Sequence, residues 1–297
     1  MNLCITGALG HIGSHLIRNL KIKNLKKIYL VDNLSTQRYC SLFDLPKKCK
    51  FSFHQLDINN KKVDSIIKNS DIVIHLAAFT DPAASFKNKT LVSKTNIQGT
   101  KNIARLCAEY NKPLLFISTT SVYFPVKKNP NPYTESKIKG EKIIRRLGKT
   151  SDLKYTIFRL GTIFGWSIGM RFNTAVNKFV WQAANKQPIT IWKTALNQIH
   201  PYCGLNDAAL AINFVINKQL FNNQVYNIVT LNTSPKKIIK IIKKHIPNIQ
   251  VQLISSVAMT KSSLEISNLK SKKIGIKYKD SLNEEIKKII GFLPSQE

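Results

Sequence analysis

The feature that most limits how this chain can fold is a glycine pattern between a strand and a helix near its N-terminus. The apolar run 2–6 predicts a buried strand, and Gly7, Gly10 and Gly13 follow in T-G-A-L-G-H-I-G, opening a helix expected over 12–23. The first glycine permits a tight turn, the second lets the backbone approach a pyrophosphate, and the third lets the helix pack closely on the strand. The helix N-terminus then offers free N–H groups to phosphate. The pattern predicts a dinucleotide-binding βαβ unit.

A carboxylate stands where the ribose of such a dinucleotide would lie. Asp32 ends a strand expected over 27–32, 19 residues after Gly13. A carboxylate there can accept hydrogen bonds from both ribose hydroxyls and would repel the extra phosphate of NADP. NAD is therefore the predicted cofactor. Asp57, at the end of a third strand over 50–56, either meets the adenine edge or caps a helix.

Strands and helices alternate through the first half of the chain. Further short apolar strands are predicted over 72–76, 114–118 and 155–160, with a long helix over 91–110. This alternation is typical of a parallel sheet with helices on both faces. The predicted fold class is α/β, a doubly wound parallel sheet of the Rossmann type.

The pattern changes after Gly161. Helices are predicted over 172–184, 205–217, 234–245 and 282–290, and strands over 189–192 and 225–228. We therefore expect an NAD-binding domain over 1–165, continued by about 198–230. A smaller α/β substrate-binding lobe is expected over 166–197 and 231–297.

The chain is strongly basic, with 46 Lys and Arg against 16 Asp and Glu and a formal charge of +30. Only seven of these cations are Arg, the side chain best suited to bidentate contacts with phosphates and bases. The Lys residues are spread along the whole chain, which favours a compositional bias over a nucleic-acid site. We expect no specific nucleic-acid partner, although the charge would attract an anionic substrate.

Cysteine spacing and hydropathy indicate the compartment. The five cysteines are scattered without a C-x-x-C pair, so neither a disulfide framework nor a metal site is expected. No apolar run approaches the roughly 18 residues that a membrane span needs. Because Met1–Thr6 is already predicted to be a strand, no signal peptide is expected. The sequence predicts a cytoplasmic protein with no membrane span.

Tyr133 and Lys137 form the candidate catalytic pair in N-P-Y-T-E-S-K. Four residues apart on a helix, their side chains share one face. A neighbouring ammonium favours the phenolate form of tyrosine, which can then act as a general base toward an alcohol. The hydroxyl run Ser118–Ser121 ends the strand before them, at the sheet edge where ligands bind. One of these hydroxyls can hold a substrate oxygen while Tyr133 takes its proton.

Taken together, these motifs resemble the extended short-chain dehydrogenase/reductases of the NAD-dependent epimerase/dehydratase family, which includes UDP-galactose 4-epimerase. The resemblance covers nearly the whole chain. It rests on T-G-A-L-G-H-I-G, V-D-N-L-S-T, H-L-A-A, N-I-Q-G-T, I-S-T-T-S-V-Y, Y-T-E-S-K, R-L-G-T-I-F-G, H-P-Y-C-G-L-N-D and V-Y-N-I. Members of this family oxidise a carbon of a nucleotide-activated sugar, usually C4, with NAD as the hydride acceptor and tyrosine as the proton acceptor.

The resemblance carries roles onto particular residues. It implies a catalytic set of Thr119, Tyr133 and Lys137. The implied cofactor-binding set is Gly7, Gly10, His11, Ile12, Gly13, Asp32, Asn33, Asp57, Ile58, Leu76, Ala77, Ala78, Thr80, Asn96, Tyr133 and Lys137. The implied substrate-binding set is Thr119, Thr120, Thr162 and His200. Arg171 is a further candidate, which either replaces a lost phosphate contact or is a surface charge. His75, alone at the end of its strand, is more typical of a structural residue.

The chain departs from the family pattern at several positions. Dehydratases and decarboxylases of the family need an acidic residue directly after the catalytic threonine, and here Thr120 and Ser121 follow it. Thr162 replaces the Asn, and His200 the Arg, that usually contact the substrate's diphosphate. Phe124 replaces a glycine, and the segment from Tyr123 to the catalytic tyrosine is shorter than usual.

These features predict an NAD-dependent nucleotide-sugar epimerase that oxidises and re-reduces a sugar carbon through a keto intermediate, and that works as a homodimer. Two alternatives remain open. One is a one-way NAD-dependent nucleotide-sugar dehydrogenase or reductase, which would exchange its cofactor at each turnover. The other is a non-catalytic NAD-binding protein, which the complete catalytic set disfavours.

Overall fold

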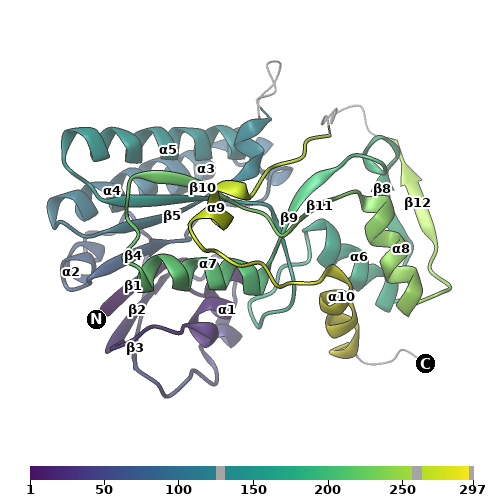
Figure 1. Ribbon diagram of the computed structural model, residues 1–297, viewed down its shortest axis with the longest axis horizontal. Coiled ribbons are helices and arrows are strands. Elements are labelled where there is room, and N and C mark those ends of the chain that lie inside the picture. The colour runs from purple at the N-terminus through teal and green to yellow at the C-terminus, as the bar shows by residue number, and fades with distance from the viewer. Residues whose placement is uncertain (125–130, 256–262, 294–297) are drawn as a thin grey trace. The chain divides into compact units, whose positions relative to one another are not determined.

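The computed structural model describes residues 1–124, 131–255 and 263–293, and the chain forms two compact units (Figure 1). The first unit consists of Met1–Arg159, Ser167–Gly169 and Ala209–Tyr226, and the second of Leu160–Trp166, Met170–Ala208 and Asn227–Glu297. The chain thus passes between the units several times. It first leaves the first unit after Arg159, a few residues before the expected domain boundary at 165. The assignment of NAD to one unit and of substrate to the other stays a prediction.

A seven-stranded sheet has the strand order β10-β6-β5-β4-β1-β2-β3. Its strands are β1 (Asn2–Thr6), β2 (Lys27–Asp32), β3 (Lys50–Gln55), β4 (Ile72–His75), β5 (Leu114–Thr119), β6 (Tyr155–Leu160) and β10 (Gln224–Ile228). β1 pairs in parallel with both β2 and β4, so the strand order reverses between β1 and β4. This arrangement confirms the doubly wound fold, and in such folds ligands generally bind at the carboxyl ends of the strands where the order reverses.

Helices cover both faces of this sheet (Figure 1). One face carries α1 (His11–Asn19) and α7 (Leu205–Asn217), and the other carries α2 (Val63–Lys68), α4 (Thr100–Glu109) and α5 (Pro132–Thr150). Asn213 of α7 donates to the carbonyl of Asn19 at the end of α1 (3.0 Å). Under α2, α4 and α5, apolar side chains of the helices and strands form one buried cluster that includes Phe116 and Ile144. This cluster fixes α5 against β5.

The long helix predicted over 91–110 is not a regular α-helix. It consists of α3 (Lys89–Val92), a π-helical segment η3 (Ser93–Gly99) and α4. Gly99 packs directly against Ile58, and a Cβ at position 99 would clash with Ile58 Cδ1. The wider π-helical turn brings Asn96 to a buried position, as is common where helices carry functional side chains.

The second unit contains two small sheets and four helices among the described residues. The sheets have the orders β11-β9-β7 and β12-β8, with β7 (Thr162–Phe164), β8 (Ile189–Trp192), β9 (His200–Gly204), β11 (Leu231–Thr233) and β12 (Val251–Ile254). The helices are α6 (Ala175–Ala184), α8 (Pro235–His245), α9 (Leu269–Lys273) and α10 (Leu282–Gly291). α6, α8 and α10 share one buried apolar cluster. None of the helices in the described ranges has the length and apolarity needed to cross a membrane.

Some elements of this unit differ from the prediction. Strands β7, β9, β11 and β12 were not expected, because they span only three to five residues each and one of them contains Pro201. The helix expected from residue 172 begins instead at Ala175. The side chain of Asn177 donates to the carbonyl of Arg171 (3.0 Å), and this bond holds the preceding residues outside the helix.

Candidate active site

Gly7 and Gly10 lie between β1 and α1, and Gly13 lies in the first turn of α1; each position needs glycine to a different degree. Gly7 has a positive φ of 66°, and a Cβ there would lie 2.6 Å from the backbone nitrogen of Ala77. A Cβ on Gly13 would lie 2.4 Å from the carbonyl oxygen of Ala8. At Gly10 the nearest backbone atom to such a Cβ is 3.3 Å away, so this position is more open. The loop therefore has the shape of a pyrophosphate cradle, and its residues fit a dinucleotide.

Asp32 is anchored where β2 ends. Its carboxylate accepts hydrogen bonds from the backbone N–H of Leu9 (3.0 Å) and of Leu34 (2.9 Å), which ties the glycine loop to the loop after β2. The Asp32 carboxylate oxygens keep further lone pairs that can accept ribose hydroxyls. Its role at the ribose stays a prediction.

Arg38 is a candidate that the sequence analysis missed. One guanidinium nitrogen of Arg38 lies 3.9 Å from the position of a Cβ on Gly10. Burial lowers the pKa of Arg38, and the nearby charge of Asp32 works against this effect. A cation beside the glycine loop suits a pyrophosphate or an adenosine. The signal in the sequence is an Arg six residues after the ribose carboxylate, and its place over the glycine loop is visible only in three dimensions.

Other predicted cofactor residues organise turns. Asn33 Oδ1 accepts from the N–H of Ser35 (3.0 Å), and Asp57 Oδ1 accepts from the N–H of Asn59 (2.8 Å). Asp57 does not cap the following helix, because Lys62 precedes α2. Their contacts with adenosine stay predictions, as do those of His11 and Ile12 in the first turn of α1 and of Ile58, which packs on Gly99.

His75 is a buried structural residue at the end of β4. Its Nδ1 lies 2.7 Å from Thr6 Oγ1 and its Nε2 lies 3.1 Å from Thr100 Oγ1. Burial, together with the charge of Lys137, lowers the pKa of His75 to about 3. The imidazole is therefore neutral and links β1, β4 and α4. The half-buried segment that follows carries the predicted cofactor residues Leu76, Ala77, Ala78 and Thr80.

Asn96 in the π-helical turn connects this segment to the catalytic helix. Its side chain accepts from the N–H of Phe79 (2.7 Å) and donates to the carbonyl of Phe79 (2.9 Å). It also donates to Ser136 Oγ (2.8 Å), which in turn donates to the carbonyl of Tyr133 (2.6 Å). Both amide protons of Asn96 are thus used inside the protein. Any effect of Asn96 on the cofactor would pass through the two segments that it holds.

The proposed catalytic residues come from two neighbouring elements. Thr119 is the last residue of β5, while Tyr133 and Lys137 lie one turn apart in α5. α5 begins at Pro132 because Asn131 caps it, accepting from the N–H of Thr134 (3.2 Å). The hydroxyl of Thr119 donates to Ser121 Oγ (3.2 Å) and accepts from the N–H of Ser121 (3.1 Å). The structure thus packs the hydroxyl strand against the helix of the Tyr–Lys pair.

Lys137 is almost completely buried. Its Nζ donates to the carbonyl of Ile117 (2.8 Å) and lies 4.9 Å from the centre of the Phe116 ring. Burial lowers the pKa of Lys137 to about 8, although the negative charge of Glu141 works in the opposite direction. Lys137 is therefore mostly an ammonium at neutral pH, as the proposed stabilisation of a tyrosinate requires.

The predicted substrate residues Thr162, Arg171 and His200 belong to the second unit. Thr162 opens β7 and is exposed, and His200 opens β9 opposite Thr233 of β11. β7 and β9 are neighbours in the same sheet, with Thr162 facing Tyr202. Arg171 lies in the segment between β7 and α6, where its Nε donates to Asn173 Oδ1 (2.6 Å). The structure therefore brings Thr162 and His200 together on one small sheet, and their contact with a diphosphate stays a prediction.

The short connection between Tyr123 and the catalytic tyrosine falls mostly on residues 125–130, which lie outside the described ranges. Phe124, which replaces a family glycine, is described, and its N–H donates to the carbonyl of Ser121 (3.0 Å).

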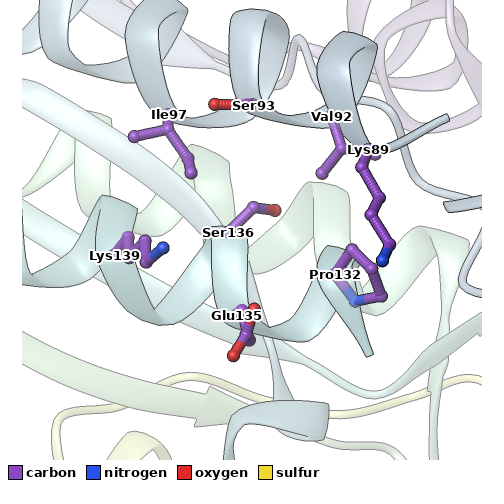
Figure 2. A pocket seen from close by; sticks show the side chains of 8 residues that line it. All are labelled: Lys89, Val92, Ser93, Ile97, Pro132, Glu135, Ser136 and Lys139. Carbon is purple, nitrogen blue, oxygen red and sulfur yellow. The ribbon is translucent and has the colours of Figure 1, made fainter. Parts of the chain in front are cut away.

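A pocket of about 280 Å³ lies between α3, η3 and the first turns of α5 (Figure 2). Its lining residues are Lys89, Val92, Ser93, Ile97, Pro132, Glu135, Ser136 and Lys139. Neither the glycines nor Thr119 and Tyr133 line it. The proposed catalytic hydroxyls therefore lie outside the lining of this pocket.

Known proteins resemble this chain in sequence and in fold. The profile described as the NAD dependent epimerase/dehydratase family matches residues 3–229. A dTDP-D-glucose 4,6-dehydratase of Dictyostelium discoideum is 30% identical over 259 residues, a match covering 77% of this chain and 58% of that protein. The chain therefore spans less than two thirds of that relative. A putative UDP-glucose 4-epimerase of Methanocaldococcus jannaschii is 28% identical over 260 residues, with 82% of each chain covered.

Solved structures share the fold over almost the whole chain. A UDP-glucuronic acid 4-epimerase from Bacillus cereus, in complex with UDP-glucuronic acid and NAD, superposes with a TM-score of 0.88 and 22% identity over 98% of both chains. A UDP-N-acetylglucosamine 4-epimerase from Methanobrevibacter ruminantium gives a TM-score of 0.84 and 24% identity over 98% of this chain and 97% of that one.

Proposed function

Because the chain belongs to the NAD dependent epimerase/dehydratase family, we propose that it is an NAD-dependent nucleotide-sugar epimerase that inverts a sugar carbon, C4 in the simplest case. The first unit binds the cofactor and carries out the chemistry, and the second recognises the nucleotide sugar. The enzyme works as a cytoplasmic homodimer.

The observation that carries the proposal is the chemistry at the end of β5. Thr120 is buried and Ser121 bonds with Thr119, and neither can act as a carboxylate base. Dehydration or decarboxylation needs such a base beside the catalytic threonine, whereas oxidation and re-reduction at one carbon do not. Relatives named as dehydratases and decarboxylases are as similar in sequence as those named as epimerases. The hydroxyls at 120 and 121 therefore favour epimerisation.

In this reaction the cofactor and each proposed catalytic residue have a separate role. NAD, when bound, supplies the hydride acceptor and donor. Tyr133 removes the proton of the sugar hydroxyl as the carbon is oxidised, and returns it after the keto sugar has presented its other face. Thr119 holds the reacting oxygen, and Lys137 stabilises the ionised Tyr133 through its charge.

The test is an assay of the purified protein with a panel of UDP-sugars and added NAD. An epimer has the mass of its substrate, a dehydrated product has lost one water, and a decarboxylated product has lost carbon dioxide. We expect a product of unchanged mass whose NMR spectrum shows inversion at one ring carbon, formed without net reduction of NAD. Net formation of NADH would instead identify a one-way dehydrogenase, and bound NAD without any turnover would identify a non-catalytic protein.

A further inference from the structure

We infer that a buried ion pair between Glu141 and Arg159 positions the catalytic groups for the reaction proposed above, on which this inference rests. The pair joins α5, β5 and β6 around Thr119 and places a negative charge near Lys137. It makes no contact with substrate or cofactor in this assignment, so both residues are positioning residues.

The geometry of Glu141 supports this role. Its Oε1 accepts from Ser118 Oγ (2.7 Å) and from Arg159 Nε (2.9 Å). Its Oε2 accepts from Arg159 Nη2 (2.7 Å) and from Arg145 Nη2 (3.1 Å). Both oxygens of a side chain that is only 4% exposed are thus satisfied, and the bidentate contact with Arg159 fixes the orientation of the two planar groups.

The pair holds the backbone on both sides of Thr119. Ser118, which donates to Glu141, directly precedes Thr119 in β5. On the other side, the guanidinium carbon of Arg159 lies 4.6 Å from the centre of the Tyr123 ring, in the turn Thr120–Tyr123 that follows Thr119. A movement of Glu141 or Arg159 would therefore shift the proposed catalytic hydroxyl.

The pair also acts on Lys137, one helical turn before Glu141. Burial works to raise the pKa of Glu141, but the bonds from Arg159 and Ser118 outweigh it and leave that pKa below its usual value. The resulting carboxylate opposes the effect of burial on Lys137. Among the described residues, His75 of β4 also feels the charge of Lys137 and is neutral, while Arg159 of β6 is paired with Glu141. Glu141 is thus the anion that favours the charged form of Lys137.

The main test compares pH profiles of kcat for wild type and Glu141→Gln. The amide keeps the size of the side chain and removes its charge. We expect the alkaline limb of kcat to move to lower pH by about one unit, the low end of the shifts caused by a nearby charge. From a starting pKa of about 8, the loss would be about fivefold at pH 8 and about twofold at pH 7, with KM nearly unchanged. Glu141→Asp keeps the charge, so its alkaline limb of kcat should lie at the wild-type pH.

Two further variants separate positioning from charge and from a general structural effect. Ser118→Ala removes the bond to β5 and leaves the carboxylate, so kcat should fall at every pH while the limb stays in place. Glu109→Gln is the matched control, because Glu109 forms an exposed pair with Arg105 on α4, with the four-residue spacing that also separates Glu141 from Arg145. It should change neither kcat nor the limb.

A readout without turnover keeps the test independent of the proposed function. The pH titration of the Lys137 side-chain NMR resonance, assigned by its absence in Lys137→Met, should shift to lower pH in Glu141→Gln with NAD added. An unshifted titration would overturn the effect on Lys137, and an unchanged kcat in Ser118→Ala would overturn the positioning of Thr119. A wild type that turns over no nucleotide sugar would refute the proposed function, while the titration would still decide whether Glu141 acts on Lys137.

Discussion

The groups proposed for the chemistry and those proposed for the substrate are held in different ways. In the first unit Lys137 is buried and donates a hydrogen bond to the backbone of β5. The carboxylate of Glu141 accepts hydrogen bonds from Ser118 and Arg159. In the second unit Thr162 is exposed and His200 is half-buried, both at the ends of short strands. The comparison indicates that packing fixes the groups proposed for the chemistry, while the groups proposed for recognition lie at the less buried ends of short strands.

The largest expected effect comes from Tyr133→Phe. This change removes the proton acceptor and almost no volume, so turnover should fall about a thousandfold, within the range known for general bases. NAD affinity, measured by calorimetry, should stay within about threefold of wild type, since proton transfer and not binding needs the hydroxyl. Activity within tenfold of wild type would remove Tyr133 from the mechanism.

Gly7→Ala should test how closely the glycine loop of the first unit is packed. The positive φ and the short distance to the Ala77 nitrogen predict a loss of about 3 kcal/mol in the free energy of unfolding, with weaker NAD binding. Gly291→Ala is the control, because a Cβ there meets no atom within 4 Å. Its unfolding free energy should stay within about 1 kcal/mol of wild type. Equal urea midpoints for the two variants would contradict the cradle geometry.

Lys137→Met should reveal the energetic penalty of burying a cation. The pKa of Lys137 falls from its ordinary 10.5 to about 8 on folding. The unfolded chain therefore holds this proton more tightly, and stability falls as the pH drops from 10.5 to 8, by about 3 kcal/mol. Allowing about 1 kcal/mol for the lost bond to Ile117, the variant should be about 2 kcal/mol more stable than wild type at pH 7. Urea titrations should show this advantage disappearing above about pH 10, and a constant difference would refute it.

Asp32→Asn should narrow the preference for NAD over NADP. The amide lacks the charge that repels a ribose phosphate and the second acceptor for ribose hydroxyls, so NAD affinity should fall about tenfold while NADP affinity changes less. Asp152→Asn, at an exposed carboxylate, serves as the control. A wild type that binds NADP as tightly as NAD in the same titrations would show that Asp32 does not face the ribose.

The smallest effect is expected from His200→Arg, at one of the proposed substrate residues of the second unit. A guanidinium offers five donors and a permanent charge where a neutral imidazole offers one donor, so UDP should bind about threefold to tenfold more tightly. kcat should change little, because ground and transition states gain equally. Unchanged UDP affinity in calorimetry would mean that His200 packs in its sheet and does not touch a diphosphate.

Much of the first unit could be predicted from the sequence because its signals are local. β1, β2 and β6 have the predicted bounds, since buried parallel strands are short apolar runs with clear ends. β7, β9 and β11 could not be found in this way. They are too short to show periodicity, and they pair with one another across as many as 40 positions of sequence, as Thr162 with Tyr202 illustrates.

The sequence by itself determined the glycine cradle and the placement of Tyr133 and Lys137 on one helical face, because both follow from backbone sterics and helical spacing over a few residues. Only the tertiary structure decided which groups surround them. Arg38 reaches the glycine loop, and Glu141 meets Arg159, because packing brings together side chains that are far apart in the chain. Burial then sets the protonation of Lys137, and burial is a property that a single helix does not possess.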